Sequence, residues 1–164
     1  MTLDVVGRLE LHHRRLLRRM DEAGRARQAR RRRGILEKLA KELRQHFQTE
    51  DRLLFPAAQK AVLVRSDAEL FGQGREAHAE QLGALEGVTR QLSDTPSISA
   101  FLYQFSVALR SHFRFEEERL FPLARRALGR QALLELAQAM PAERNGQRKK
   151  AASPPRRAAG RTKA

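Results

Sequence analysis

The sequence predicts an all-α protein, an up-down antiparallel four-helix bundle with a pseudo-twofold internal repeat, a short fifth helix and a disordered basic carboxy-terminal tail. Glycine (10 residues) and proline (6 residues) are scarce in a chain of 164 residues, which favours helices over a strand-rich fold. Apolar residues recur at helical spacing through long segments with short breaks between them, and a histidine-containing phrase occurs twice. A hydrophobic content of 41% is enough for one core.

Capping and helix-breaking residues predict where each helix begins and ends. Four long helices are predicted over about residues 2–23, 34–62, 67–92 and 97–128, and a fifth over 131–140. The segment 66–69 (Ser-Asp-Ala-Glu) has the pattern of a capping box, residues 94–97 form a break, and Gly129 ends the fourth helix. Short connections between long helices are typical of an up-down bundle. Residues 1–141 therefore form the bundle with its fifth helix, and residues 142–164 form the tail.

The net charge of +14 is unevenly distributed. Residues 142–164 contain eight Lys and Arg against the single Glu143, a net charge of +7, and no Leu, Ile, Val or aromatic residue. Because such a segment cannot offset its ordering entropy by burial, it is predicted to be disordered. A second basic cluster follows the first predicted helix and consists of six arginines: Arg25, Arg27, Arg30, Arg31, Arg32 and Arg33.

Several classes of site are excluded by composition. The chain has no cysteine, so a metal would have to be held by histidines and carboxylates. No apolar stretch approaches the length of a membrane span, and Asp4, Arg8 and Glu10 interrupt the region where a signal peptide would be apolar. We therefore expect a cytoplasmic protein without a membrane partner.

Two eleven-residue segments share one phrase. Residues 46–56 read HFQTEDRLLFP and residues 112–122 read HFRFEEERLFP, so the shared pattern is H-F-x-x-E-[DE] followed by L-F-P. The phrase begins at His46 and at His112, an offset of 66 residues, and His13 and His78 are separated by 65 residues. The first two helices are thus echoed by the next two, which predicts two similar hairpins.

Each long helix places one histidine in the middle of its apolar face. On helical wheels of about 100° per residue, these four are His13, His46, His78 and His112. On the second helix, the predicted apolar neighbours of His46 are Leu39, Leu43, Leu53 and Ala57. His12 lies about 100° away from His13 and is predicted to be a surface residue or a neighbour of the site. A single core histidine is ordinary, but four in matching register favour a shared site.

Two carboxylates join the histidines. Glu50 and Glu116 each follow a histidine by four residues, so each shares the face of that histidine and can reach the same ion. Asp51 and Glu117 follow by five residues and lie about 140° round an ideal helix, so they would need local unwinding and are weaker candidates. Two carboxylates on apolar faces beside four imidazoles require a compensating cation, which a metal would supply.

These residues resemble the hemerythrin-like, or HHE cation-binding, domain family over about residues 4–128. The resemblance implies an oxo- or hydroxo-bridged di-iron centre with two iron ions per chain. It also implies histidines 13, 46, 78 and 112 as terminal ligands and Glu50 and Glu116 as bridging carboxylates. A ferritin-like site would need Glu-x-x-His on two helices, and only Glu10 to His13 fits that spacing.

One departure from the family bears on function. Oxygen-carrying hemerythrins have a His-x-x-x-His pair on the third helix, whereas Gly74 and Leu82 stand four residues either side of His78 here. Four imidazoles, two bridging carboxylates and one further bridge fill about ten of about twelve positions around two irons. The more open centre favours reaction with O₂, NO or peroxide, or sensing of iron or oxygen, over reversible oxygen carriage. Turnover of peroxide or NO would identify a catalytic enzyme instead.

The basic segments give an alternative interpretation. The tail and the arginine cluster could neutralise phosphates and bind nucleic acid without sequence specificity, and the bundle would then be a structural or metal-storage module. No helix-turn-helix, zinc-finger or aromatic stacking motif accompanies them. Arg14, Arg15, Arg18 and Arg19 point away from His13 and are interpreted as a solvated helix face. The oligomeric state and the partner of the tail are left open by the sequence.

Overall fold

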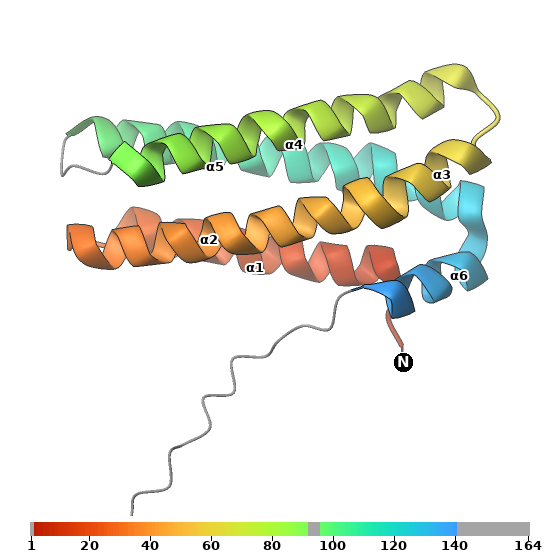
Figure 1. Ribbon diagram of the computed structural model, residues 1–164, viewed down its shortest axis with the longest axis horizontal. Coiled ribbons are helices and arrows are strands. Elements are labelled where there is room, and N and C mark those ends of the chain that lie inside the picture. The colour runs from red at the N-terminus through yellow and green to blue at the C-terminus, as the bar shows by residue number, and fades with distance from the viewer. Residues whose placement is uncertain (1, 92–95, 141–164) are drawn as a thin grey trace, which may run out of the picture.

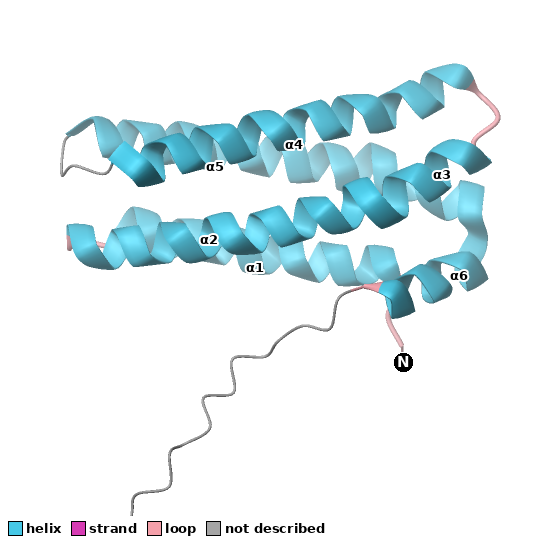
Figure 2. Ribbon diagram, viewed as in Figure 1, coloured by secondary structure: helices cyan, strands magenta, loops and turns pink. Residues whose placement is uncertain are grey.

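The computed structural model describes residues 2–91 and 96–140. Within these two ranges every regular element is helical and no strand is present (Figure 2). The elements are α1 (Val5–Arg25), α2 (Ala29–Thr49), the π-helical turn η1 (Glu50–Leu54), α3 (Phe55–Ala61), α4 (Arg65–Gln91), α5 (Pro96–Phe115), the π-helical turn η2 (Glu116–Leu120) and α6 (Phe121–Ala139). The all-helical class predicted from the sequence is confirmed for this part of the chain. The predicted tail (142–164) lies outside the described residues.

Four long helical rods pack around a shared interior (Figure 1). The second rod is α2 continued through η1 into α3, and the fourth is α5 continued through η2 into α6. Helix α1 contacts α2 and α5, and helix α4 contacts the same two partners. Helix α6 contacts α3 and α1 at one end of the structure (Figure 1). Each rod therefore turns one face inward, as the single apolar face per predicted helix requires.

Several helix boundaries differ from the predictions. The second helix begins at Ala29 rather than residue 34, so Arg30 to Arg33 lie in its first turns. The third long helix begins at Arg65, which places Ser66 inside the helix, and the predicted capping box at 66–69 is wrong. Gly129 does break the fourth rod, because its φ of 72° lies in the left-handed region that favours glycine. Asp4 caps α1 by accepting a hydrogen bond from the Gly7 backbone N–H at 2.8 Å.

The buried side chains form two apolar clusters at successive levels of the bundle. The first cluster includes Leu16, Met20, Leu36, Leu39, Leu43, Phe47, Leu85, Phe105, Leu109 and Phe113. The second includes Val5, Val6, Leu9, Leu54, Phe55, Ala58, Phe71, Leu120, Phe121 and Ala124. Burial of this apolar surface is the main favourable contribution to folding.

The two π-helical turns shift the buried register of their rods by one residue. In η1 the Phe55 backbone N–H bonds to the Glu50 carbonyl, five residues back, and in η2 Phe121 bonds to Glu116 in the same way. After Glu50 the buried positions are therefore Leu54, Phe55 and Ala58. The predicted inward positions, Leu53 and Ala57, are only partly buried, because an unbroken 3.6-residue repeat does not include the extra residue of a π turn.

Gly74 marks a close approach between α4 and the two π-turn rods. A Cβ atom at this position would lie 3.0 Å from Cε2 of Phe55 and 3.1 Å from Cδ1 of Leu120. Both neighbours are fully buried, so neither can move away without disturbing the core. Gly83, on the same helix, has open space at the corresponding point.

We predict that Gly74→Ala and Gly83→Ala change stability in opposite directions. Gly83→Ala should raise the free energy of unfolding by about 0.5–1 kcal/mol, because alanine restricts the unfolded chain and favours the helix. Gly74→Ala should lower it by about 1–2 kcal/mol, because overpacking outweighs that gain. Urea denaturation followed by circular dichroism measures both values. Equal stabilisation by the two variants would contradict the close packing at Gly74.

Candidate metal centre

The structure brings all six predicted site residues together in one polar layer. His13 lies on α1, His46 on α2, His78 on α4 and His112 on α5, while Glu50 and Glu116 are the first residues of η1 and η2. All six side chains are buried, and the two glutamates are 0% exposed. Because the first apolar cluster includes Phe47 and Phe113 and the second includes Phe55 and Phe121, the layer lies where the two clusters meet.

The histidines form two close pairs, one from α1 and α2 and the other from α4 and α5. The Nε2 atoms of His13 and His46 are 2.9 Å apart, and their ring centroids are separated by 4.7 Å. The ring centroids of His78 and His112 are 4.9 Å apart. The two pairs therefore repeat in space the correspondence that the sequence repeat predicted.

Each glutamate has contacts with both histidine pairs. Glu116 Oε2 lies 3.2 Å from Nε2 of His13, whereas Glu116 Oε1 lies 2.9 Å from Nε2 of His78 and 3.0 Å from Nε2 of His112. Glu50 Oε1 lies 3.4 Å from Nε2 of His46, and Glu50 Oε2 lies 3.4 Å from Nε2 of His78. Both carboxylates thus extend one oxygen toward each pair.

Two groups within this layer have the composition and spacing of metal-binding sites. One contains His13, His46, Glu50 and Glu116, the other contains His78, His112 and Glu116, and one potential ligand atom per residue lies within 4.8 Å of the others in its group. Imidazole and carboxylate groups bind zinc, copper, iron and nickel, so this donor set suits a transition metal. Because Glu116 belongs to both groups, two ions here would share a carboxylate.

Burial and mutual contact separate the pKa values of the two glutamates. Burial, and next the negative charge of Glu116, raise the pKa of Glu50 well above its usual value. Burial alone would also raise the pKa of Glu116, but its close contacts with the imidazoles of His112, His13 and His78 lower it well below its usual value. The layer thus favours one ionised and one protonated carboxyl group, and a bound cation would replace that proton.

The imidazoles are also perturbed by their surroundings. Burial, and next the positive charge that His13 can carry, lower the pKa of His46 well below its usual value. For His78, burial lowers the pKa, but hydrogen bonds with Asp51 and Glu116 outweigh it and raise the pKa. A buried imidazole with a lowered pKa stays neutral at physiological pH and keeps the lone pair that a metal needs.

Glu50 shows that the protein groups alone do not satisfy this layer. Neither of its carboxylate oxygens accepts a hydrogen bond, and Nδ1 of His46 also lacks a partner. A buried carboxylate without a hydrogen bond is costly unless a cation compensates its charge. The residues present therefore fit a bound metal ion on a structural criterion that is independent of the sequence resemblance.

The repeated phrase of each rod also holds the histidine contributed by a neighbouring helix. Phe47 and Phe55 both stack on His78, with ring centroids at 3.9 and 5.5 Å. Phe113 and Phe121 do the same for His13, at 3.9 and 5.5 Å. No role for these phenylalanines is predicted from the sequence, although they recur at the same two places in both phrases.

Asp51 and Glu117 also reach the site, although an ideal helix would direct them away from it. Asp51 Oδ1 accepts a hydrogen bond from Nδ1 of His78 at 2.8 Å, and Glu117 Oε1 accepts one from Nδ1 of His13 at 2.7 Å. The local unwinding that these positions required is present as η1 and η2. They contact the outer ring nitrogens, however, whereas Glu50 and Glu116 face the interior.

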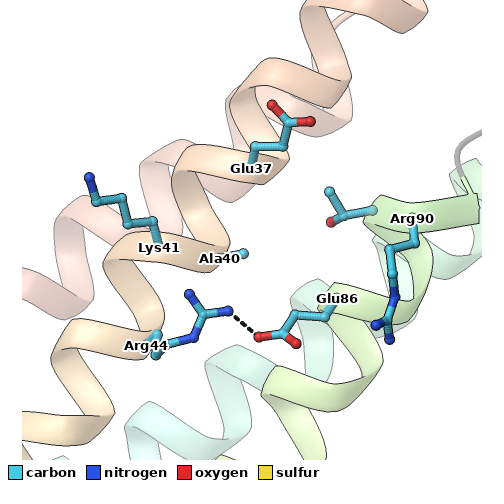
Figure 3. A pocket seen from close by; sticks show the side chains of 7 residues that line it. Glu37, Ala40, Lys41, Arg44, Glu86 and Arg90 are labelled. Atoms are coloured by element: carbon cyan, nitrogen blue, oxygen red, sulfur yellow. Dashed lines mark hydrogen bonds and ion pairs between the residues drawn. The ribbon is translucent and has the colours of Figure 1, made fainter.

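Other sequence features lie outside this layer. His12 is partly buried, with its ring centroid 5.9 Å from that of His46. A surface pocket between α2 and α4 is lined by Glu37, Ala40, Lys41, Arg44, Glu86, Thr89 and Arg90, with an ion pair between Arg44 and Glu86 across it (Figure 3). None of the six site residues lines this pocket. Among the described helices, none has the length and apolar character to span a membrane.

Comparison with known proteins agrees with the geometry of the layer. The hemerythrin HHE cation-binding domain family matches residues 4–124, which include all four histidines and both buried glutamates. No curated protein and no solved structure matches the chain significantly. A family match over this share of the chain, together with the buried histidine and glutamate layer, leads to one conclusion: the chain belongs to the hemerythrin HHE cation-binding domain family.

Proposed function

We propose that this protein holds two iron ions in the polar layer and reacts with a small diatomic ligand or oxidant such as O₂, NO or peroxide. His13 and His46 would hold one ion, His78 and His112 the other, and Glu50 and Glu116 would bridge them. The domain would comprise residues 1–141 as an up-down antiparallel bundle with two hairpins related by a pseudo-twofold axis. Residues 142–164 would be a basic segment outside that domain.

The observation that carries this proposal is the placement of both carboxylates between the two histidine pairs. Each glutamate has one oxygen within 3.4 Å of a histidine in each pair, and Glu50 has no hydrogen-bond donor of its own. Two bound cations would give both carboxylates the positive partners that the protein groups do not supply. When bound, iron supplies redox chemistry toward O₂, NO or peroxide, and the protein residues supply its ligands and a water-poor surrounding.

The packing at Gly74 supports a centre that is not an oxygen carrier. Oxygen carriers of this family have a His-x-x-x-His pair on this helix, whereas Gly74 and Leu82 stand four residues either side of His78 here. Here even a Cβ atom at residue 74 would lie 3.0 Å from Phe55 and 3.1 Å from Leu120. An imidazole does not fit that space, so residue 74 could not supply the second histidine of such a pair without disturbing the core. We therefore favour sensing, storage or detoxification over reversible oxygen transport.

Metal content tests the proposal. Protein loaded with ferrous iron under anaerobic conditions should contain about two irons per chain, and exposure to air should produce near-ultraviolet absorption that a zinc-loaded sample lacks. Because histidine binds metal only when neutral, dialysis below about pH 5.5 should release both ions. Metal analysis and an optical spectrum at each pH measure these effects. A stoichiometry of one iron per chain, or full retention at pH 4, would contradict the proposed centre.

We predict that Glu50→Gln stabilises the metal-free protein at neutral pH. The pKa of Glu50 is raised in the folded state, so its contribution to the free energy of unfolding is most favourable below the unfolded pKa of about 4.3. This contribution decreases as the pH rises. Glutamine lacks that charge, so the metal-free variant should be more stable than wild type by about 1 kcal/mol or more at pH 7. The difference should disappear near pH 4, and iron binding should be weakened. Urea denaturation in the presence of a chelator measures this.

Glu118→Gln is the matched control for that experiment. Glu118 is exposed and pairs with Arg114 on the surface, so removing its charge should change stability by less than about 0.5 kcal/mol at either pH. A Glu50→Gln variant that is less stable than wild type at pH 7 without metal would show that the buried charge of Glu50 is already compensated by protein groups.

A specific feature favours nucleic-acid binding as a second function. Arg25, Arg27, Arg30 and Arg31 are exposed where α1 ends and α2 begins. The first turn of α2 contains no acid, and its N-cap residue Gln28 makes no side-chain capping hydrogen bond. Cations are unfavourable at a helix amino terminus, and phosphates are favourable there. A phosphate backbone would therefore compensate both the arginines and the helix end.

We predict that the double variant Arg30→Ser/Arg31→Ser binds duplex DNA several-fold more weakly than wild type at low salt. The slope of log affinity against log salt should fall by about two, because about two phosphate contacts are lost. The double variant Arg65→Ser/Arg114→Ser removes the same charge elsewhere and should have little effect, whereas deletion of residues 142–164 should also weaken binding. Fluorescence anisotropy measures the affinities. Wild-type binding that ignores salt would rule out this second function.

A further inference from the structure

Within the described part of the chain, two of the layer histidines have a carboxylate at hydrogen-bond distance from the outer ring nitrogen. His78 has Asp51 and His13 has Glu117, at 2.8 and 2.7 Å from Nδ1. Nδ1 of His46 has no hydrogen-bond partner. The two supported histidines are those whose own helices, α4 and α1, lack the repeated phrase. The carboxylate contact at Nδ1 is therefore found for the histidines of α1 and α4, and not for every buried histidine of the layer.

Each supporting acid belongs to the opposite hairpin. Asp51 lies in η1, which follows α2 in the first hairpin, and it contacts His78 of the second. Glu117 lies in η2 of the second hairpin and contacts His13 of the first. The same rods supply the phenylalanines that stack on these two imidazoles. Each phrase thus provides a histidine and a glutamate to the layer. It also provides the stacking phenylalanines and the hydrogen-bonding acid that contact a histidine of the other hairpin.

The contact at Nδ1 has a defined chemical consequence. A neutral imidazole carries one N–H, and a carboxylate can only accept, so Asp51 and Glu117 require the proton to stand on Nδ1. Nε2 then keeps a lone pair. In the metal-free protein Glu116 competes for the same proton, at 2.9 Å from Nε2 of His78 and 3.2 Å from Nε2 of His13, but the contacts of Asp51 and Glu117 with Nδ1 are shorter. This is the tautomer in which Nε2 can bind a metal.

The exposure of the two acids shows that the contact is not an ordinary surface ion pair. The side chains of Asp51 and Glu117 are 32% and 42% exposed, whereas their histidine partners are 2% and 1% exposed. The acceptor oxygen of each acid is directed at a ring that neighbouring aromatic side chains hold in place. The pair therefore fixes the orientation and protonation of a buried group from the surface.

We infer that Asp51 and Glu117 are positioning residues that hold His78 and His13 as Nδ1-protonated tautomers with Nε2 directed into the layer, and thereby set its affinity for metal. This inference rests on the proposed metal function for its effect on affinity. Its effect on the tautomers is independent of any metal. The second acid of H-F-x-x-E-[DE], which is Asp51 or Glu117, thus has a different role from the glutamate that precedes it.

Nitrogen-15 NMR of histidine-labelled, metal-free protein tests the inference directly. At about pH 8.5, where imidazoles are largely neutral, His13 and His78 should show the Nδ1-protonated tautomer. Asp51→Leu should shift His78 toward the Nε2-protonated form and leave His13 unchanged, and Glu117→Leu should do the reverse. Competition with a chelator should show iron affinity reduced about 10–100-fold in each variant. Asp51→Asn and Glu117→Gln retain an acceptor oxygen and should give intermediate losses.

Glu118→Leu is the matched control, because Glu118 is adjacent to Glu117 but pairs with Arg114 on the surface. It should change neither the tautomers nor the iron affinity. Unchanged tautomers in Asp51→Leu and Glu117→Leu, with iron bound at wild-type affinity, would overturn the inference and leave the metal function intact. Crossed tautomer shifts in a protein that binds no iron would support the positioning role and reject the metal function.

Discussion

The structure depends on one constraint, the burial of two carboxylates among four imidazoles between two apolar clusters. Glu50 and Glu116 are fully buried, and the opposite directions of their pKa shifts show that the layer does not favour two negative charges without a cation. Other features of the interior serve that layer. The apolar clusters exclude water from it, the phenylalanines fix two rings, and each glutamate faces both histidine pairs. A metal site is the arrangement that makes this burial favourable.

The π-helical turns connect the sequence phrase to this geometry. In a regular α-helix, residues four and five positions after a histidine differ in direction by about 100°, so both cannot serve the same layer from one face. By widening the helix at Glu50 and Glu116, η1 and η2 direct the first acid to the interior and the second to the neighbouring helix. Because each second acid crosses to the other hairpin, the layer is completed only when the two hairpins pack together.

The sequence was sufficient for the helical class and for the residues of the layer, because both follow from periodicity. Four histidines and two glutamates on apolar faces had to meet if the helices packed at all. It was insufficient where the backbone leaves the regular repeat. A helical wheel predicts Leu53 on the inward face and Asp51 away from the site, whereas Leu54 is the fully buried residue and Asp51 contacts His78. A wheel of constant pitch does not include the extra residue of a π turn. The capping box at Ser66 failed because the helix begins at Arg65.

Under the proposed function, each hairpin would hold its own ion with one histidine pair and would contribute one carboxylate to both ions. Anomalous scattering from crystals of the iron-loaded protein, collected at the iron absorption edge, tests it most directly. The account predicts two iron positions in the layer, one bonded to Nε2 of His13 and His46 and the other to Nε2 of His78 and His112, with Glu50 and Glu116 between them. A single iron position, or iron bonded to Asp51 or Glu117, would contradict it.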